Sequence, residues 1–378
     1  MKKCIVISDS FKGSLPSRDI CAIARERIPL YFPACEVRAL SVADGGEGTV
    51  DCFLDSCGGE RVLVSGVQNP YSEPIDAAYA LLPDGTAVIE MAAAAGLPLV
   101  AGRKNPCVTT TYGVGQLIAD ALARGARRIV LGLGGSATND GGCGCAAALG
   151  VRFYDAAGQS FVPVGDTLGR IARIDTAEAE ALLRSVEITV MCDVTNPLCG
   201  ENGCSAVFGP QKGATPEMIR EMDGYMRNYA ALTKELYPES NLDTPGAGAA
   251  GGLGFALGVF LHAELMPGIE IVMEETRLEE KIKNADFIVT GEGRLDAQTA
   301  MGKAPVGVAK LAKKYHKPVI AFAGGIEKGA EVCNKAGITA FFPAVRGVTT
   351  LDEAMRPETA AENLAESAEQ VFRLLTLR

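Results

Sequence analysis

Residues 4–14 read CIVISDSFKGS, and this stretch decides the class of fold. Residues 4–8 are apolar and rich in β-branched side chains, as in a buried parallel strand. A helix is expected to follow at about residues 18–28, with Ser17 as its N-cap. A second strand, expected at residues 37–42, leads into a second helix. This opening of strand, helix, strand and helix is typical of the α/β class.

The same alternation of strand and helix returns near the C-terminus. Between these two regions, short strand-like runs and turns at residues 60–90 suggest antiparallel pairing, and hence a different domain. We therefore predict an α/β protein of two domains. One is a Rossmann-like parallel-sheet domain made from both chain ends, residues 1–58 and 280–378, and the other is an inserted mixed α/β domain at residues 59–279. The C-terminal strands are expected at residues 286–290, 318–323 and 339–343.

The composition limits the classes of function. The chain has 378 residues, of which 48% are hydrophobic, and a formal net charge of −10. This negative charge argues against nucleic acid or an anionic membrane as a partner, because both require basic surfaces. The 12 cysteines, an N-terminus without a signal peptide and the lack of an apolar run of about 18 residues predict a cytoplasmic protein with free thiols. The oligomeric state stays open, and a homo-oligomer is one of the options.

Five loops rich in acidic or other polar residues each follow a short apolar run, and four of the five contain glycine. In α/β enzymes, a strand that ends at such a loop and leads into a helix commonly binds phosphate and Mg²⁺. Glycine lets backbone N–H groups approach an anion closely, and carboxylates hold the hard cation. The loops therefore predict a phosphate-handling site. They lie at residues 9–14, 43–48, 134–142, 192–197 and 291–296.

The loop at residues 134–142, GGSATNDGG, is the strongest of these signals. An ordinary turn requires fewer glycines, so we interpret the loop as a phosphate or substrate site in which N–H groups and hydroxyls bind the ligand. The sequence has no Walker A motif, because Gly302 and Lys303 are followed by alanine, and it lacks the protein-kinase motifs. Phosphate contacts must then come from backbone glycines and a few cations. Residues 245–254, also rich in glycine, are either a hinge or a backbone cradle for an anion.

Phosphoryl transfer needs a carboxylate that accepts the hydroxyl proton and cations that neutralise the phosphoryl group. Asp193, at the end of an apolar strand, is our first candidate for the base, and Asp296 is the second. Arg294 suits bidentate binding of a carboxylate, and Lys12 is a further catalytic cation. Mg²⁺ is expected at Asp44 and Asp193. The candidates for contact with substrate or phosphate are Asp9, Ser10, Asp44, Gly45, Gly46, Glu47, Gly134, Gly135, Ser136, Asn139, Asp140, Asn196, Lys212 and Glu292.

Each of these residues also has a plain structural alternative. A single Asp at a strand end often caps the helix that follows. Lys12, Lys212 and Arg294 can be ordinary surface cations. His262 and His316 lack acidic neighbours in the sequence, so we expect neither of them to be the general base.

Taken together, the motifs resemble those of the bacterial type I glycerate kinases. The resemblance implies an enzyme that uses ATP and Mg²⁺ to convert D-glycerate to 2-phosphoglycerate in the cleft between the two domains. The chain departs from some relatives at Ala300 and Met301, where those proteins carry Ser and His, so no histidine is expected to act at this place. The matching stretches are residues 42–49, 89–94, 134–142, 192–198, 208–213, 245–252 and 291–296, in the family's order.

The residues alone support a coarser conclusion, a phosphate-handling α/β enzyme with carboxylates. One alternative is a kinase of a related small sugar acid. Another is a two-domain ligand-binding protein without catalysis, but such a protein would not need several carboxylates next to Gly-rich loops and would normally be exported. Release of ADP with glycerate as the acceptor separates these interpretations.

Overall fold

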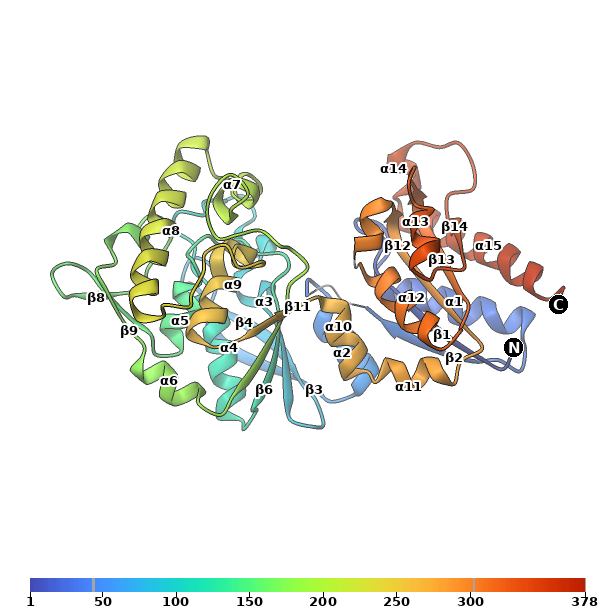
Figure 1. Cartoon of the computed structure of the whole chain (residues 1–378), viewed down its shortest axis with the longest axis horizontal. Helices are drawn as coiled ribbons and strands as arrows, with labels where there is room; N and C mark the ends of the chain where they lie inside the picture. The colour runs from blue at the N-terminus through green and yellow to red at the C-terminus, as the bar shows by residue number, and fades with distance from the viewer. Residues whose placement is uncertain (43–44, 302, 378) are drawn as a thin grey trace. The chain divides into compact units, whose positions relative to one another are not determined.

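The computed structural model describes residues 1–42, 45–301 and 303–377 of the chain. The chain folds into two compact units, and Figure 1 colours it from the N-terminus to the C-terminus. The terminal unit contains residues 1–43, 55–57 and 267–378, and the inserted unit contains residues 44–54 and 58–266. The domain boundaries expected at residues 58 and 280 remain a prediction, because compactness alone does not show that a segment folds by itself.

The terminal unit has one parallel sheet whose five strands come from both chain ends. Its order is β14-β13-β12-β1-β2, so the sheet grows from β1 to β2 and then restarts on the other side of β1. This reversal is the topological switch point of a doubly wound sheet. The predicted Rossmann-like domain from both ends of the chain is confirmed. The strands are β1 (Lys3–Ser8), β2 (Glu36–Ser41), β12 (Phe287–Leu295), β13 (Val319–Ile326) and β14 (Ala340–Pro343).

Alternating side chains of β1 face two apolar cores. Ile5 and Ile7 belong to the core that contains α12 (Ala304–Lys314), whereas Cys4 and Val6 belong to the core that contains α1 (Ser17–Tyr31) and α15 (Pro357–Leu375). Helices on both faces explain why the strands read as nearly continuous apolar runs. The other helices of this unit are α10 (Gly268–Glu275), α11 (Leu278–Lys283), η4 (Ala297–Met301), α13 (Val332–Ala336) and α14 (Leu351–Ala354), and α2 (Thr49–Cys57) contributes residues to both units.

Two local predictions for this unit are wrong. Ser17 is the first residue of α1 and not its N-cap, and its hydroxyl donates to Ser8 O at 2.6 Å and accepts the Val42 N–H at 2.9 Å. The hydroxyl thus ties the ends of β1 and β2 together. The strand expected at residues 286–290 continues through Leu295, because Glu292, Arg294 and Leu295 still pair with β13.

The inserted unit is built on a mixed sheet of order β11-β10-β6-β5-β4-β3. The four strands β5, β6, β10 and β11 are parallel, whereas β3, β4 and β5 pair antiparallel as their spacing predicts. A separate antiparallel sheet of β8, β7 and β9 is not predicted by the sequence. The strands are β3 (Glu60–Gln68), β4 (Pro74–Leu81), β5 (Thr86–Glu90), β6 (Arg128–Gly132), β7 (Arg152–Tyr154), β8 (Ser160–Phe161), β9 (Arg173–Asp175), β10 (Glu187–Met191) and β11 (Glu264–Met266).

The helices of the inserted unit share one apolar core with its main sheet. The longest helix, α8 (Pro216–Leu236), begins after Thr215, whose hydroxyl accepts the Met218 N–H. It buries Met222 and Met226, as its helical spacing predicts. Within the described residues, no helix has both the length and the apolar character needed to cross a bilayer. The other helices are α3 (Ala92–Ala95), η1 (Leu97–Val100), α4 (Tyr112–Ala123), α5 (Cys143–Ala148), η2 (Leu168–Arg170), α6 (Ala177–Leu183), α7 (Cys204–Phe208), η3 (Pro210–Lys212) and α9 (Ala249–Phe260).

Candidate active site

Polar side chains of the terminal unit gather at the carboxyl ends of β1 and β12, on the two sides of the switch point. Asp9, Ser10 and Lys12 follow β1, and Glu292 and Arg294 lie in the last part of β12. All five line one pocket of about 760 Å³. Doubly wound sheets bind their ligands at this place. The fold thus brings together candidates that are nearly 300 residues apart in the sequence.

Glu292 is the buried carboxylate of this pocket. Only 5% of the residue is exposed, and its Oε1 accepts the Thr299 hydroxyl at 2.6 Å. Burial raises the pKa of the Glu292 carboxyl, and the charges of Asp9 and Asp296 raise it further, while Thr299 and Lys303 oppose the shift. Lys303 Nζ lies 3.8 Å from Glu292 Oε2 and 3.7 Å from Asp296 Oδ1, so one cation is shared by two carboxylates.

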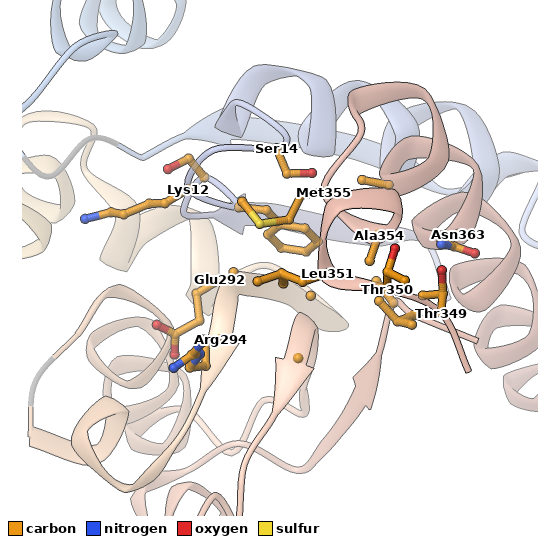
Figure 2. Close-up of a pocket in the computed structure, with 18 of the residues that line it drawn as sticks. Lys12, Ser14, Glu292, Arg294, Thr349, Thr350, Leu351, Ala354, Met355 and Asn363 are labelled. Carbon is orange, nitrogen blue, oxygen red and sulfur yellow. The ribbon is translucent and has the colours of Figure 1, made fainter. Parts of the chain in front are cut away.

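Figure 2 shows that the pocket has two chemically different ends. Lys12, Glu292 and Arg294 lie toward one side of the view, and Thr349, Thr350 and Asn363 lie toward the other, with Leu351 and Met355 between them. One end is therefore charged, and the rest of the wall is apolar or carries neutral polar groups.

Arg294 and Asp296 differ in how free they are to bind a ligand. Arg294 forms an exposed ion pair with Glu327 at 3.1 Å. Such surface pairs contribute only about 0–1 kcal/mol, so the guanidinium can turn to an anion at small cost. Asp296 is not among the residues that line the pocket. Its Oδ1 accepts the Thr299 N–H at 3.0 Å and lies 3.3 Å from the Thr299 hydroxyl, which donates to Glu292. These contacts favour a structural role for Asp296.

In the inserted unit, the loop at residues 134–142 starts at the carboxyl end of β6, between β5 and β10. The Gly134 N–H donates to Gly45 O at 2.8 Å. A Cβ on Gly132 would lie 2.3 Å from Gly45 O, and a Cβ on Gly134 would lie 2.4 Å from Gly46 Cα. These glycines are therefore required for the close packing of two backbone segments. Approach of N–H groups to an anion, the reason given by the sequence, is not needed to explain them.

Asp140 is fully buried, and its carboxylate is occupied by four donors of the protein. It accepts the N–H and the hydroxyl of Thr111 at 2.7 and 2.8 Å, the Gly142 N–H at 3.0 Å and the Gly144 N–H at 3.2 Å. The carboxylate thus joins the start of α4 to the start of α5. Protein donors occupy this carboxylate, and the contact between Asp140 and phosphate remains a prediction.

Lys212 is also buried, with 1% of the residue exposed, and its Nζ donates to Thr138 O at 2.6 Å. Burial lowers the pKa of Lys212 to about 8. The Asn139 amide donates to Ser205 Oγ at 2.9 Å, whereas Asn139 Oδ1 and Thr138 Oγ1 are buried without a hydrogen-bond partner among the described residues. Unpaired buried oxygens are rare and mark a place where water or a ligand is expected.

The glycine-rich segment before and within α9 packs against the loop at residues 134–142. The Gly141 N–H donates to Gly251 O at 3.0 Å. Gly251 has φ +69°, and a Cβ there would lie 2.0 Å from Thr138 O. Gly251 and Gly252 of the segment at residues 245–254 pack against the loop at residues 134–142, whereas Pro245 is exposed, and the choice between a hinge and an anion cradle remains a prediction.

The remaining candidates of the inserted unit are placed as follows. Asp193 is exposed and lies two residues after β10, and Glu47 is exposed as well. The Asn196 amide donates to Asn202 O at 2.9 Å. Ser136 is 8% exposed and Gly135 has φ +74°. Asp44 lies outside the described residues, so only Asp193 of the predicted Mg²⁺ pair is placed.

Some residues of these sites are missed by the sequence reasoning. Glu90 ends β5, accepts the Val50 N–H at 2.7 Å, and has its pKa raised by burial. A carboxylate at the end of an apolar run was the available signal, the same one that identifies Asp193. Lys303 had a weaker signal, its place directly before α12. Leu351 and Asn363 belong to no motif and are found only from the pocket.

The donor atoms of the terminal unit fit Mg²⁺ bound together with phosphate. Among the residues that the structure describes, no three His, Cys, Asp or Glu side chains are arranged to hold an ion by themselves. Mg²⁺ usually takes one or two protein carboxylates and fills its other positions with water and phosphate oxygens. Asp9 and Glu292 both line the pocket and would supply such a pair. Burial is the main cause that raises the pKa of Glu292, and the charge of Asp9 raises it further, a repulsion that a bound cation would relieve.

Comparison with known proteins gives a consistent result. The model of the "Glycerate kinase family" matches residues 4–376. "Glycerate kinase" of Bacillus subtilis is 45% identical over 371 residues, which is 98% of this chain and 96% of that protein. "Glycerate 2-kinase" of Escherichia coli is 44% identical over 378 residues, covering 99% and 98% of the two chains. A crystal structure described as glycerate kinase 2, from Salmonella typhimurium LT2, aligns with a TM-score of 0.87 and 42% identity over 99% of this chain and 98% of that one.

Proposed function

Because the chain belongs to the glycerate kinase family, as its motifs predict, we propose that it transfers the γ-phosphoryl group of ATP to the 2-hydroxyl of D-glycerate. The products are ADP and 2-phosphoglycerate. The observation that carries the proposal is the match over nearly the whole length to a relative named for phosphorylation at the 2-position. The residues named above belong to both units, and an interdomain place of reaction remains a prediction.

The charges of the terminal unit support a role in phosphoryl transfer. This reaction depends mainly on positioning and on neutralising the charge of the phosphoryl oxygens. Lys12, Arg294 and Lys303 line one pocket and supply cations for that purpose. Mg²⁺, which we propose is held by Asp9 and Glu292, would add charge neutralisation when bound with the phosphates.

The proton of the 2-hydroxyl needs an acceptor, and Asp193 remains our first choice. It is an exposed carboxylate beside the end of a parallel strand, where a small substrate has access to it. Asp296 is the second choice, but the hydrogen bond from the Thr299 N–H occupies one of its oxygens. Asp44 keeps its predicted role as a metal or phosphate ligand. We further propose that the enzyme acts in the cytoplasm, which agrees with 12 cysteines that are all free thiols.

The reaction is tested with purified protein, D-glycerate, ATP and Mg²⁺. Enolase acts directly on 2-phosphoglycerate, so we expect its product to form without any other enzyme. If a phosphoglycerate mutase is needed before enolase, the 3-hydroxyl is the acceptor and the regiochemistry proposed here is wrong. Absence of ADP release would contradict the kinase reaction itself, and a higher kcat/KM with a longer sugar acid would change the substrate.

A further inference from the structure

The pocket of the terminal unit lies where a doubly wound sheet binds ligands, but its position alone does not say which of two substrates it takes. Its size and its chemistry distinguish them. The pocket has a volume of about 760 Å³, within the range of about 300–1,000 Å³ typical of sites for larger organic ligands. Glycerate, a three-carbon acid, would leave most of this volume empty. A nucleotide is the larger of the two substrates and fits the volume better.

The apolar wall also favours a nucleotide. Val348 and Leu351 both line the pocket. Val348 is fully exposed, and Leu351 is 69% exposed. An apolar ring that covers large exposed apolar side chains removes their surface from water, and this stabilises the complex. Glycerate has no such ring. Leu351 and Met355 lie between the charged end and the neutral polar end in Figure 2. A nucleotide whose purine base lies against these two side chains would have its phosphates at the cations. The edge of its base would face the neutral polar groups.

Two polar groups of the pocket are suited to hydrogen bonds with such a ligand. Ser14 Oγ is buried and has no hydrogen-bond partner within the described part of the chain. The Asn363 amide, at the neutral end in Figure 2, offers both a donor and an acceptor, which is what the edge of adenine requires. At the opposite end, Lys12 and Arg294 supply the positive charge that phosphates require.

We propose that this pocket is the ATP site, with adenine against Leu351 and Met355 near Asn363 and with the phosphates beside Lys12, Arg294 and Lys303. Glycerate then binds elsewhere. The assignment rests on the proposed function for the identity of the nucleotide as a substrate. It goes beyond the family relationship, because it states which of the two units recognises the base.

The test compares two leucine variants of the full chain. Leu351→Glu places a charge against the proposed base, and Leu30→Glu is the matched control, because Leu30 is 62% exposed in the same unit and does not line the pocket. Both substitutions are at exposed positions, so both variants should fold, which circular dichroism and the melting temperature check. ADP affinity is measured by calorimetry without glycerate, and KM is then measured separately for ATP and for glycerate.

We expect Leu351→Glu to weaken ADP binding at least about tenfold and to raise KM for ATP, because the charge is desolvated by the base. KM for glycerate should stay within about twofold of wild type, and Leu30→Glu should match wild type in all three measurements. Unchanged ADP affinity in Leu351→Glu, or a raised KM for glycerate alone, overturns the assignment while leaving the kinase reaction intact. The wild type could also bind ADP without phosphorylating glycerate. If Leu351→Glu then loses ADP binding, the result supports the site and rejects the proposed function.

Discussion

The two units use the same kind of loop, glycine beside acidic or amide residues at a strand end, in opposite ways. In the terminal unit, Asp9, Glu292 and Arg294 line a pocket. In the inserted unit, Asp140 and Lys212 are buried, and they bind backbone groups of Thr111 and Thr138, respectively. Similar residues thus face a pocket in one unit and the protein interior in the other.

Single glycines differ in how closely the chain packs around them, although Gly291 of the terminal unit is crowded as well, since a Cβ there would lie 2.4 Å from Phe322 O. A Cβ on Gly325, in β13, would have no atom within 4 Å, whereas a Cβ on Gly132, in β6, would lie 2.3 Å from Gly45 O. A Gly-rich acidic motif therefore indicates a strand end at which the backbone turns sharply or packs closely against another segment. It does not indicate whether the polar groups face a ligand, because that depends on which other segments cover them.

The largest effect is expected for Asp193, and its substitution tests whether an exposed carboxylate of the inserted unit acts as the general base. Asp193→Asn should lower kcat by about 10²–10⁴ if Asp193 is the general base, because the amide cannot accept the proton. Asp296→Asn in the terminal unit is the control and should change kcat much less. The melting temperature should hardly change, since the substitution is isosteric. Wild-type kcat with a lower melting temperature would make Asp193 a structural residue and pass the base to Asp296 or Asp44.

A pair of glycine variants measures the difference in packing. Gly132→Ala should destabilise the protein by about 1–3 kcal/mol, because the new methyl group overlaps the Gly45 carbonyl oxygen and the backbone must shift. Gly325→Ala should change stability by less than about 0.5 kcal/mol, because its Cβ meets open space. Thermal melting followed by circular dichroism checks both. Equal losses would show that the two strand ends are packed alike.

The burial of Lys212 predicts a pH dependence that belongs to the inserted unit. The folded protein releases this proton at a pKa of about 8, against an ordinary value of 10.5, so the unfolded chain binds more protons between these pH values. The free energy of unfolding contributed by Lys212 should therefore rise with pH across this window, by roughly 1–3 kcal/mol. Denaturation of wild type and Lys212→Met at pH 7.5 and 9.5 checks this. If the difference in the free energy of unfolding between wild type and Lys212→Met is the same at both pH values, the Lys212 amine is not desolvated.

The smallest effect concerns the charged end of the pocket in the terminal unit. Arg294→Lys should raise KM for ATP by about three- to tenfold, because an ammonium cannot replace the bidentate guanidinium. Glu327→Gln, which removes only the exposed partner of Arg294, should change this KM less. A rise in KM for glycerate instead would support the prediction from the sequence that Arg294 clamps the glycerate carboxylate, and would contradict the ATP assignment.

The sequence predicts the fold class because its strands are recognisable locally. Residues 4–8 are buried on both faces of a parallel sheet, and this burial is what makes them a continuous apolar run. The extension of β12 is missed because Gly291 and Gly293 look like turn residues, although both lie within β12 and Gly291 pairs with Phe322 of β13. The sheet of β7, β8 and β9 is missed because its strands have only two or three residues each.

The site is predicted less completely, for a physical reason. Motifs identify polar residues at strand ends, and Asp9, Lys12, Glu292 and Arg294 are found in this way. They do not report burial, so Asp140 looks the same in the sequence as an exposed acid. The apolar wall around Leu351 comes from a segment that follows β14 and has no motif, because an apolar contact with a ligand requires only suitable shape.

The order of strands in the terminal unit has a consequence for how the chain is made. Cys4 of β1 pairs with Phe287 of β12, so one edge of β1 has no partner until most of the polypeptide has left the ribosome. Residues 58–266 of the inserted unit emerge without interruption and can fold while β1 and β2 still wait. Ile5 and Ile7 are fully buried in the finished protein, and the residues of α12 that share their core are made only after the inserted unit. Unpaired strand edges favour aggregation, so the segment around β1 is at risk until β12 has been made.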